Sequence, residues 1–223
     1  MTLLVKICGL KTPDALDAAL EAGADMVGFV FFPPSPRHIG PPAASDLGRR
    51  VKDRARKVAL TVDADDALLA SIVDSLQPDI LQLHGHETPA RVRAIQARFG
   101  LPVMKAVAVE VRADLAAAAD YSAAADRLLF DARAPREATR PGGLGKPFDW
   151  HLLEGLDLPI PFMLSGGLDP DNVADALRIT GAPGVDVSSG VERAPGEKDL
   201  GKIRAFVRAA RRAHTPATLA SQI

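Results

Sequence analysis

The sequence contains a single cysteine, Cys8, and its acidic and basic residues almost balance. One cysteine cannot form an intrachain disulfide, so we expect a fold that does not depend on an oxidising compartment. Lys plus Arg number 27 against 28 for Asp plus Glu, which leaves a formal charge of −1. Because neither sign is in excess, the composition favours neither nucleic-acid binding nor an acidic tail.

Long apolar runs are also missing. The N-terminal stretch reaches Lys6 without the apolar core of a signal peptide. No apolar run approaches the roughly 18 residues that are needed to span a bilayer. We therefore expect a cytoplasmic protein without a membrane partner. The hydrophobic fraction of 47% still supplies enough apolar residues for a large core.

The sequence does contain a regular alternation of short apolar runs and helical stretches. Runs such as 23–32 are continuously apolar, which is typical of parallel strands that are covered on both faces. The stretch Asp65–Leu76 is predicted to be an amphipathic helix. Its predicted apolar face consists of Leu68, Leu69, Ile72, Val73 and Leu76. The predicted strands are 3–8, 23–32, 56–63, 79–85, 101–109, 126–132, 161–167 and 184–190. The predicted helices are 13–22, 43–52, 65–76, 88–99, 113–119, a short one near 148, 170–179 and 199–212.

Strict alternation of strand and helix implies a parallel sheet. Eight such units in just over 200 residues fit a closed (β/α)₈ barrel (the TIM-barrel fold) of one domain. We expect the barrel to span residues 1–213 and residues 214–223 to form a flexible tail. An open doubly wound sheet is the alternative, but it usually carries a GxGxxG turn after its first strand, which KICGLK lacks.

In such barrels the carboxyl ends of the strands form the active face. Two stretches rich in glycine and serine are predicted there. Glycines let the backbone approach an anion closely, and N–H groups at helix starts point at it. The loops after strands seven and eight therefore predict a phosphate site, although tight turns alone would have a similar composition. The residues concerned are Gly166, Gly167, Ser188, Ser189 and Gly190, with a helix start expected at Asp169–Pro170.

Cys8 ends the first predicted strand, where a thiol could be either reactive or merely packed. A free cysteine is more often a small buried hydrophobic residue. Lys6 lies two residues earlier on the same face, and a buried lysine needs a partner, for which we predict Asp186. A nearby cation favours the thiolate over the thiol.

Asp131 ends the sixth predicted strand, where it could also be a capping or turn residue. An acid and a base that face each other across the barrel mouth are what a proton-shuffling isomerisation requires. Arg37, in a proline-rich loop, could bind a substrate carboxylate through its planar guanidinium, or it could be a solvated surface arginine.

Histidines follow the fourth predicted strand at His84 and His86. In metal-dependent barrel hydrolases an HxH pair follows strand one instead, and further histidines follow later strands. Because these partners are missing, we predict no metal site, and we assign His84 to substrate binding. The basic run 204–214 is interpreted as a solvated helix face.

Eight blocks together resemble the phosphoribosylanthranilate isomerase family. They are KICGL, GADMVGFVFFPPSPRHI, LQLHG, LLFDA, GGLGKPFDW, SGGLDPDNV, GVDVSSGVE and PGEKD, in order from Lys6 to Asp199. The sequence departs from the family where strand three ends TVDAD and in the Arg- and Pro-containing loop after Asp131. Both departures lie outside the acid–base pair, so they affect only details of the substrate loops.

The resemblance implies an enzyme that performs an Amadori rearrangement in tryptophan biosynthesis. It implies Cys8 as general base, Asp131 as general acid, Arg37 at the anthranilate carboxylate, and glycine-rich phosphate loops. The substrate would be a phosphorylated small molecule, and neither a metal nor an organic cofactor is expected. The sequence is compatible with a monomer or a homodimer. Two alternatives are a related phosphosugar isomerase with an aspartate in place of Cys8, and a catalytically silent phosphate-binding barrel.

Overall fold

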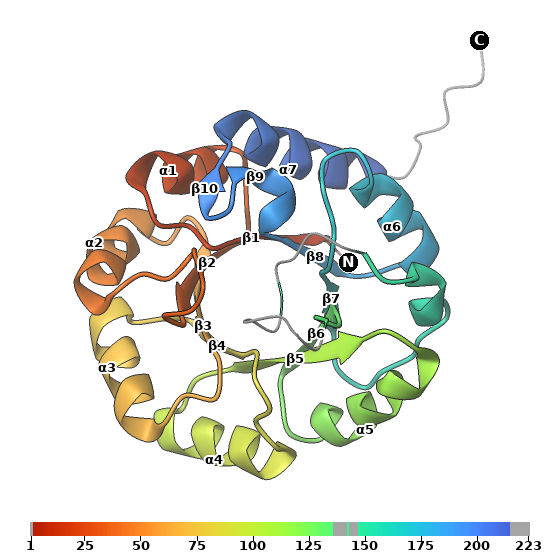
Figure 1. Ribbon diagram of the computed structural model, residues 1–223, viewed down its shortest axis with the longest axis horizontal. Coiled ribbons are helices and arrows are strands. Elements are labelled where there is room, and N and C mark those ends of the chain that lie inside the picture. Colours follow the sequence, from red (N-terminus) through yellow and green to blue (C-terminus); the bar gives the residue numbers. More distant parts are fainter. Residues whose placement is uncertain (1, 136–141, 143–146, 215–223) are drawn as a thin grey trace.

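The computed structural model describes residues 2–135, 142 and 147–214 of the chain. Eight parallel strands follow one another around a closed barrel in sequence order, from β1 to β8, and helices surround it (Figure 1). The predicted (β/α)₈ barrel is therefore confirmed. Of the predicted tail, residues 214–223, His214 is instead the last residue of the final helix, and residues 215–223 lie outside the described residues. No helix among the described residues is long and apolar enough to cross a membrane.

The bounds of the elements are as follows. The barrel strands are β1 Leu4–Cys8, β2 Met26–Phe31, β3 Arg56–Thr61, β4 Ile80–Leu83, β5 Val103–Val109, β6 Arg127–Ala132, β7 Phe162–Leu164 and β8 Gly184–Val187. The α-helices are α1 Pro13–Glu21, α2 Pro41–Val51, α3 Asp66–Leu76, α4 Pro89–Phe99, α5 Ala116–Ser122, α6 Val173–Thr180 and α7 Leu200–His214. The short 3₁₀ helices are η1 Arg112–Leu115, η2 Trp150–Leu153 and η3 Ser189–Val191, and the strands β9 Glu192–Ala194 and β10 Glu197–Lys198 form a hairpin.

Local sequence explains where several helices begin. The Thr12 side chain accepts a hydrogen bond from the backbone N–H of Ala15, so Thr12 is the N-cap of α1. Pro13 follows at the first helical position, where a missing N–H has no cost. Asp65 and Thr88 cap α3 and α4 in the same way. Each capped start places a helix directly after a loop at the barrel mouth.

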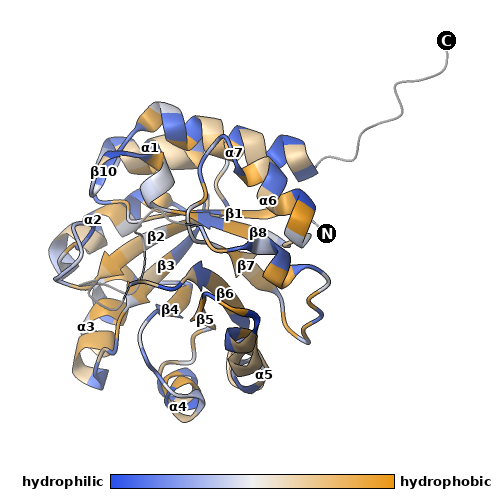
Figure 2. Ribbon diagram, turned by 45° about the vertical axis from the view of Figure 1, so that its right-hand side comes forward, coloured by the Kyte–Doolittle hydropathy of each residue, from blue (hydrophilic) through white to orange (hydrophobic). Residues whose placement is uncertain are grey.

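Alternation along the strands divides the apolar residues between two cores. One set packs between the strands and the surrounding helices. The other fills the barrel interior in layers. In Figure 2 the strands are mostly coloured hydrophobic, whereas the helices carry both colours. The deeper interior layer consists of Met26, Val58, Ile80, Met104, Ala106, Leu129 and Met163, and the layer nearer the mouth consists of Cys8, Val30 and Leu60.

Four details differ from the sequence prediction. Leu68 is 40% exposed, because it lies at the edge of the apolar face of α3 in its first turn. The unit between β6 and β7 has the one-turn helix η2 among its described residues, in place of the short helix predicted near residue 148. Helix α6 begins at Val173, because mutual hydrogen bonds between Asp169 and Asn172 hold the preceding residues in a turn. The β9–β10 hairpin was not predicted.

Candidate active site

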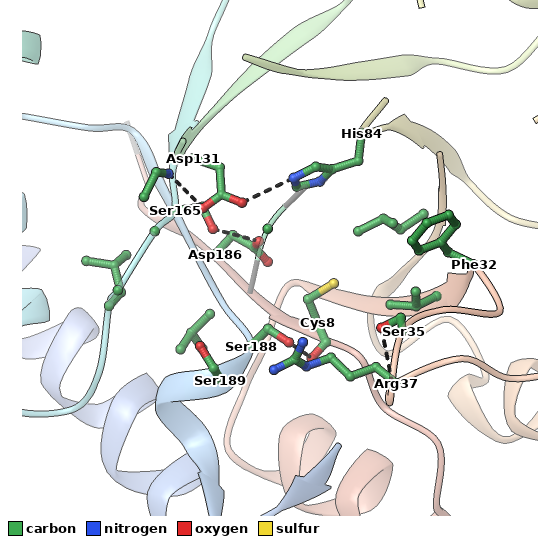
Figure 3. Close-up of a pocket in the computed structure, with 18 of the residues that line it drawn as sticks. Cys8, Phe32, Ser35, Arg37, His84, Asp131, Ser165, Asp186, Ser188 and Ser189 are labelled. Carbon is green, nitrogen blue, oxygen red and sulfur yellow. Dashed lines mark hydrogen bonds and ion pairs between the residues drawn. The ribbon is translucent and has the colours of Figure 1, made fainter. Parts of the chain in front are cut away.

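The carboxyl ends of the barrel strands surround one pocket (Figure 3). Residues from opposite ends of the sequence meet there, because closing the barrel brings β8 beside β1. Eight of the nine predicted site residues line this pocket, namely Cys8, Arg37, His84, Asp131, Gly166, Gly167, Ser188 and Ser189. Gly190 does not line it. A Cβ atom on Gly190 would collide with the Leu168 carbonyl oxygen, so Gly190 lets the loops after β7 and β8 pack together.

Lys6 and Asp186 form the predicted ion pair at the base of this pocket. Lys6 and Asp186 are register partners on the adjacent strands β1 and β8, and the Lys6 Nζ donates to Asp186 Oδ1 at 2.8 Å. Asp186 also accepts a hydrogen bond from the Ser165 hydroxyl at 3.2 Å. The Lys6 side chain is fully buried. Burial alone would lower the pKa of Lys6, but the charges of Asp186 and Cys8 raise it above its ordinary value.

The Cys8 thiol is buried beside this ion pair. Burial raises the pKa of Cys8, and the negative charge of Asp186 raises it further, while Lys6 and Lys198 offset only part of the increase. The sequence analysis predicted that a nearby cation would favour the thiolate. Lys6 has this effect, but desolvation outweighs it, so the pKa of Cys8 lies above its ordinary value.

Arg37 lies in the pocket wall and is 4% exposed, so it is not a solvated surface arginine. Its Nε donates to Glu192 Oε1 at 2.7 Å and its Nη2 donates to Glu192 Oε2 at 2.8 Å. One edge of the planar guanidinium therefore binds a carboxylate of the protein itself. The sequence analysis did not foresee Glu192 in this place.

On the side of the pocket formed by β4 and β6, His84 contacts Asp131. His84 Nε2 lies 3.1 Å from Asp131 Oδ2, and His84 Nδ1 lies 3.0 Å from the Gln82 side-chain amide. Gln82 is fully buried, and its Oε1 has no partner among the described residues. A Cβ atom on Gly142 would collide with Asp131 Oδ2, so this glycine approaches the carboxylate closely. His84 is thus a neighbour of the predicted acid, which the sequence analysis did not anticipate.

A second buried ion pair supports the loop that carries His84. The Lys105 Nζ donates to Glu87 Oε2 at 3.0 Å and to the Gly85 carbonyl oxygen at 2.7 Å, and both charged side chains are 2% exposed. Glu87 also accepts from the backbone N–H groups of Asp63 and Gly85. These bonds tie the loop after β4 to strands β3 and β5, which limits the movement of His84.

The glycine-rich loops have the conformations that a close backbone approach needs. Gly166 and Gly167 have φ values of 85° and 68°, in the left-handed region that favours glycine. Ser188 and Ser189 come from the end of β8 and the start of η3, where the first N–H groups of a helix have no intrahelical partner. Among the described residues no group of histidine, cysteine or carboxylate side chains has the arrangement of a metal site.

Comparison with known proteins bears directly on this site. A family model for "N-(5'phosphoribosyl)anthranilate (PRA) isomerase" matches residues 5–209. The N-(5'-phosphoribosyl)anthranilate isomerase of Bradyrhizobium sp. (strain ORS 278) is 68% identical over 213 residues, which cover 96% of this chain and 97% of that protein. The corresponding protein of Rhodopseudomonas palustris (strain HaA2) is 67% identical over 211 residues, 95% of this chain and 97% of that protein. The chain belongs to the phosphoribosylanthranilate isomerase family.

Solved structures agree with this assignment. Phosphoribosylanthranilate isomerase from Thermotoga maritima has a TM-score of 0.84 at 34% identity, with 94% of this chain and 99% of that chain covered. A phosphoribosylanthranilate isomerase solved in complex with reduced 1-(o-carboxyphenylamino)-1-deoxyribulose 5-phosphate has a TM-score of 0.80 at 33% identity, with the same coverage. As a member of the family, the chain is an isomerase of tryptophan biosynthesis.

Three polar residues whose side chains are buried contact the site but have no role predicted from the sequence, namely Gln82, Glu192 and Lys198. Each lies within a block that carries the family resemblance: LQLHG, GVDVSSGVE and PGEKD. The available signal was a polar residue inside or beside an apolar strand, which needs a partner once it is buried.

Proposed function

We propose that Cys8 is the general base and Asp131 the general acid of the isomerisation. The substrate is N-(5-phosphoribosyl)anthranilate. Asp131 protonates the furanose ring oxygen, the bond between this oxygen and C1 breaks, and a protonated imine forms. The Cys8 thiolate then removes the proton from C2. The resulting enolamine tautomerises to 1-(2-carboxyphenylamino)-1-deoxyribulose 5-phosphate.

One observation carries the proposal: Cys8 and Asp131 line the same pocket from β1 and β6, with space between them that the protein does not fill. In Figure 3 the labelled His84 and Asp131 lie on one side of this space, and Cys8 and Arg37 lie on the other. A substrate between them would meet an acid on one side and a base on the other.

The raised pKa of Cys8 fits a base that loses its own proton to solvent once the positive charge of the protonated imine has formed. Burial favours the neutral thiol. The protonated imine brings a positive charge close to the sulfur, and an opposite charge within about 4–6 Å favours the ionised form of a group. The same charge acidifies the C2 proton. The substrate therefore activates both partners of the proton transfer, and the chemistry requires neither a metal nor an organic cofactor.

Asp131 must hold a proton in order to act as an acid. A neutral His84 whose proton is on Nδ1 would accept a hydrogen bond from protonated Asp131 through Nε2. The Gln82 side chain can support this tautomer, because rotating its amide by 180° places Oε1, rather than Nε2, opposite Nδ1. Gln82 and His84 would then orient the Asp131 carboxyl group toward the substrate.

The remaining pocket residues would bind the two anionic ends of the substrate. Arg37 would contact the anthranilate carboxylate through its planar guanidinium. Gly166, Gly167, Ser188 and Ser189 would bind the phosphate, while Gly190 would keep the two loops together. Both ends are needed, because the reaction moves protons on atoms that lie between them.

Growth of a tryptophan auxotroph that lacks this isomerase tests the function directly. The parent protein should restore growth, and Cys8→Ala and Asp131→Asn should not. In purified protein each substitution should lower kcat by about 10²–10⁴-fold, the usual effect of a general acid or base. Circular dichroism and Tm should match the parent, since neither side chain carries a large part of the core. A rate close to the parent rate in either variant would refute the role of that residue.

We propose a small assembly, a monomer or a homodimer, in the cytoplasm. One solved structure contains monomers of the dimeric phosphoribosylanthranilate isomerase from Thermotoga maritima. The single cysteine, which acts as a free thiol in the proposed mechanism, suits a reducing compartment. Sedimentation velocity at several protein concentrations distinguishes the two assembly states.

A further inference from the structure

The β9–β10 hairpin carries two charged side chains into the wall of the active site. Glu192 begins β9 and Lys198 ends β10. The hairpin turn lies against the loop that carries Arg37, since a Cβ atom on Gly196 would collide with the Pro36 carbonyl oxygen. The mechanism proposed above assigns no role to either charged side chain.

Glu192 is the centre of a buried charge cluster that consists of Arg37, Glu192 and Lys198. Its carboxylate accepts two hydrogen bonds from Arg37, at 2.7 and 2.8 Å. It also accepts from the Lys198 Nζ at 2.9 Å and from the Gly196 N–H at 3.1 Å. The Glu192 side chain is 5% exposed. Four N–H donors share this buried carboxylate. The Arg37 guanidinium can therefore keep both of its hydrogen bonds to Glu192 in only one orientation.

Lys198 connects this cluster to the backbone of Cys8. Its Nζ donates to the Ser188 carbonyl oxygen at 2.8 Å and contacts the Ser188 hydroxyl at 3.2 Å. The Ser188 hydroxyl in turn donates to the Cys8 carbonyl oxygen at 3.1 Å. The Lys198 side chain is 2% exposed. A continuous chain of polar contacts therefore runs from Arg37 through Glu192, Lys198 and Ser188 to Cys8.

We propose that Glu192 and Lys198 are positioning residues for the reaction: Glu192 orients the Arg37 guanidinium toward the substrate carboxylate, and Lys198 holds the Ser188 segment against Cys8. This inference rests on the roles of Cys8 and Arg37 proposed above. The cluster contains two basic side chains and one carboxylate, so basic groups outnumber acidic groups in the wall that receives an anionic substrate, although burial lowers the pKa of Lys198. Lys198 also acts on the thiol through space, since its charge lowers the pKa of Cys8 against the larger effect of burial.

A purely structural role for the cluster would also make its residues sensitive to substitution, because removing one member leaves another charge buried without a partner. Loss of stability alone therefore does not test the proposal. The informative measurements are the division of the effect between KM and kcat, and the ionisation of Cys8.

The first experiment replaces Glu192 by glutamine, which keeps the size of the side chain and removes its charge. We expect KM to rise by about 10- to 100-fold, with a smaller change in kcat, because a misplaced binding group can cost about 10²-fold. Glu197→Gln is the matched control. Glu197 lies on the same hairpin, and its ion pair with Arg193 is exposed, so the KM of this variant should equal that of the parent.

An unchanged KM in folded Glu192→Gln would overturn the role of Glu192. If this variant does not fold, Glu192→Asp takes its place. The aspartate keeps the charge but is shorter by one methylene group, so it cannot reach Arg37 and Lys198 together. Arg37→Ala sets the scale, and the KM of either Glu192 variant should lie between those of the parent and Arg37→Ala.

The second experiment follows alkylation of Cys8, the only cysteine, by iodoacetamide as a function of pH. The charged groups that act on the thiol are Lys6, Asp186 and Lys198. Lys198→Met removes one cation, so the midpoint of the alkylation profile should move to higher pH. Lys198→Arg keeps the charge and should restore most of the difference. A profile of Lys198→Met that coincides with the parent profile would overturn the role of Lys198.

Failure of this inference is distinguishable from failure of the proposed function. If Cys8 is not the base, Cys8→Ala keeps its activity, whatever the Lys198 variants do. If Cys8 is the base but the cluster has no positioning role, Cys8→Ala is inactive. In that case the KM of Glu192→Gln equals that of the parent, and the alkylation profile of Lys198→Met coincides with the parent profile.

Discussion

The two sides of the active-site pocket hold their key residues in different ways. The base wall, which consists of Lys6, Cys8 and Asp186 together with the Arg37, Glu192 and Lys198 cluster, is built from buried ion pairs. The acid wall, which consists of Gln82, His84 and Asp131, is built from hydrogen bonds that involve an amide and an imidazole.

This difference matches the task that we propose for each side. The base wall must receive an anionic substrate and support a thiolate, so fixed cations are useful there. In the proposed mechanism the acid wall carries a protonated carboxyl group, and a permanent cation beside any carboxyl group favours its ionised form. We infer that ionic groups on the base wall contribute to both stability and activity, whereas the neutral groups on the acid wall contribute mainly to activity.

The largest expected effect is on the base wall. Lys6→Met leaves Asp186 buried without its ion-pair partner, so the free energy of unfolding should fall by about 3–5 kcal/mol. Urea denaturation of the parent and the variant measures the change. Arg178→Gln removes the exposed Arg178–Asp175 pair and should leave the stability nearly unchanged. A stable Lys6→Met variant would remove the distinction between the two walls.

A smaller effect, of a different kind, is expected on the acid wall. Gln82→Met removes the hydrogen-bond partner of His84 Nδ1. The free energy of unfolding should therefore fall by about 0.5–1.5 kcal/mol, the usual net contribution of one hydrogen bond. The variant should nevertheless lose about tenfold in kcat, since general acid catalysis depends on the position and protonation of the acid. Steady-state kinetics and urea denaturation of the same sample test both statements. A variant that loses stability but keeps its kcat would reverse our interpretation of this wall.

The smallest effect is on the pH dependence of stability. Burial alone would raise the pKa of Glu192, but Arg37 and Lys198 hold it below its ordinary value. A group whose pKa is lower in the folded protein binds protons more weakly there than in the unfolded chain, so its stabilisation is present above the unfolded pKa, near 4.3, and is lost as the pH falls through the folded value. The Tm of Glu192→Gln should therefore decrease less between neutral and acid pH than that of the parent. If the Tm of Glu192→Gln and the Tm of the parent decreased equally, the Glu192 carboxylate would not be stabilised as an anion.

Most of the fold could be predicted from the sequence because the alternation of strand and helix is a local property. Pro13 and the caps Thr12 and Asp65 lie within a few residues of the helices they begin. The start of α6 was predicted too early, and the cause is again local. Asp169 and Asn172 form hydrogen bonds with each other, and the turn that these bonds hold competes with a helix over the same residues. The β9–β10 hairpin was missed because such short strands have no distinctive pattern.

Part of the site could be predicted for a similar reason. Alternation places Lys6 and Cys8 on one face of β1, and closure of the barrel by β8 places Asp186 opposite Lys6. Asp131 and the glycine loops follow from their positions at strand ends. The partner of Arg37 could not be found in this way, because Glu192 is 155 residues distant and belongs to a hairpin outside the barrel.

The sequence by itself determined which residues reach the mouth of the barrel, since strand period and strand order depend only on neighbours along the chain and on closure. Only the tertiary structure decided how the charges there are paired and how strongly burial opposes ionisation of Cys8. The physical reason is that the energy of a charge depends on every group and every water molecule within a few ångströms of it, and these neighbours come from segments that meet only when the chain is folded.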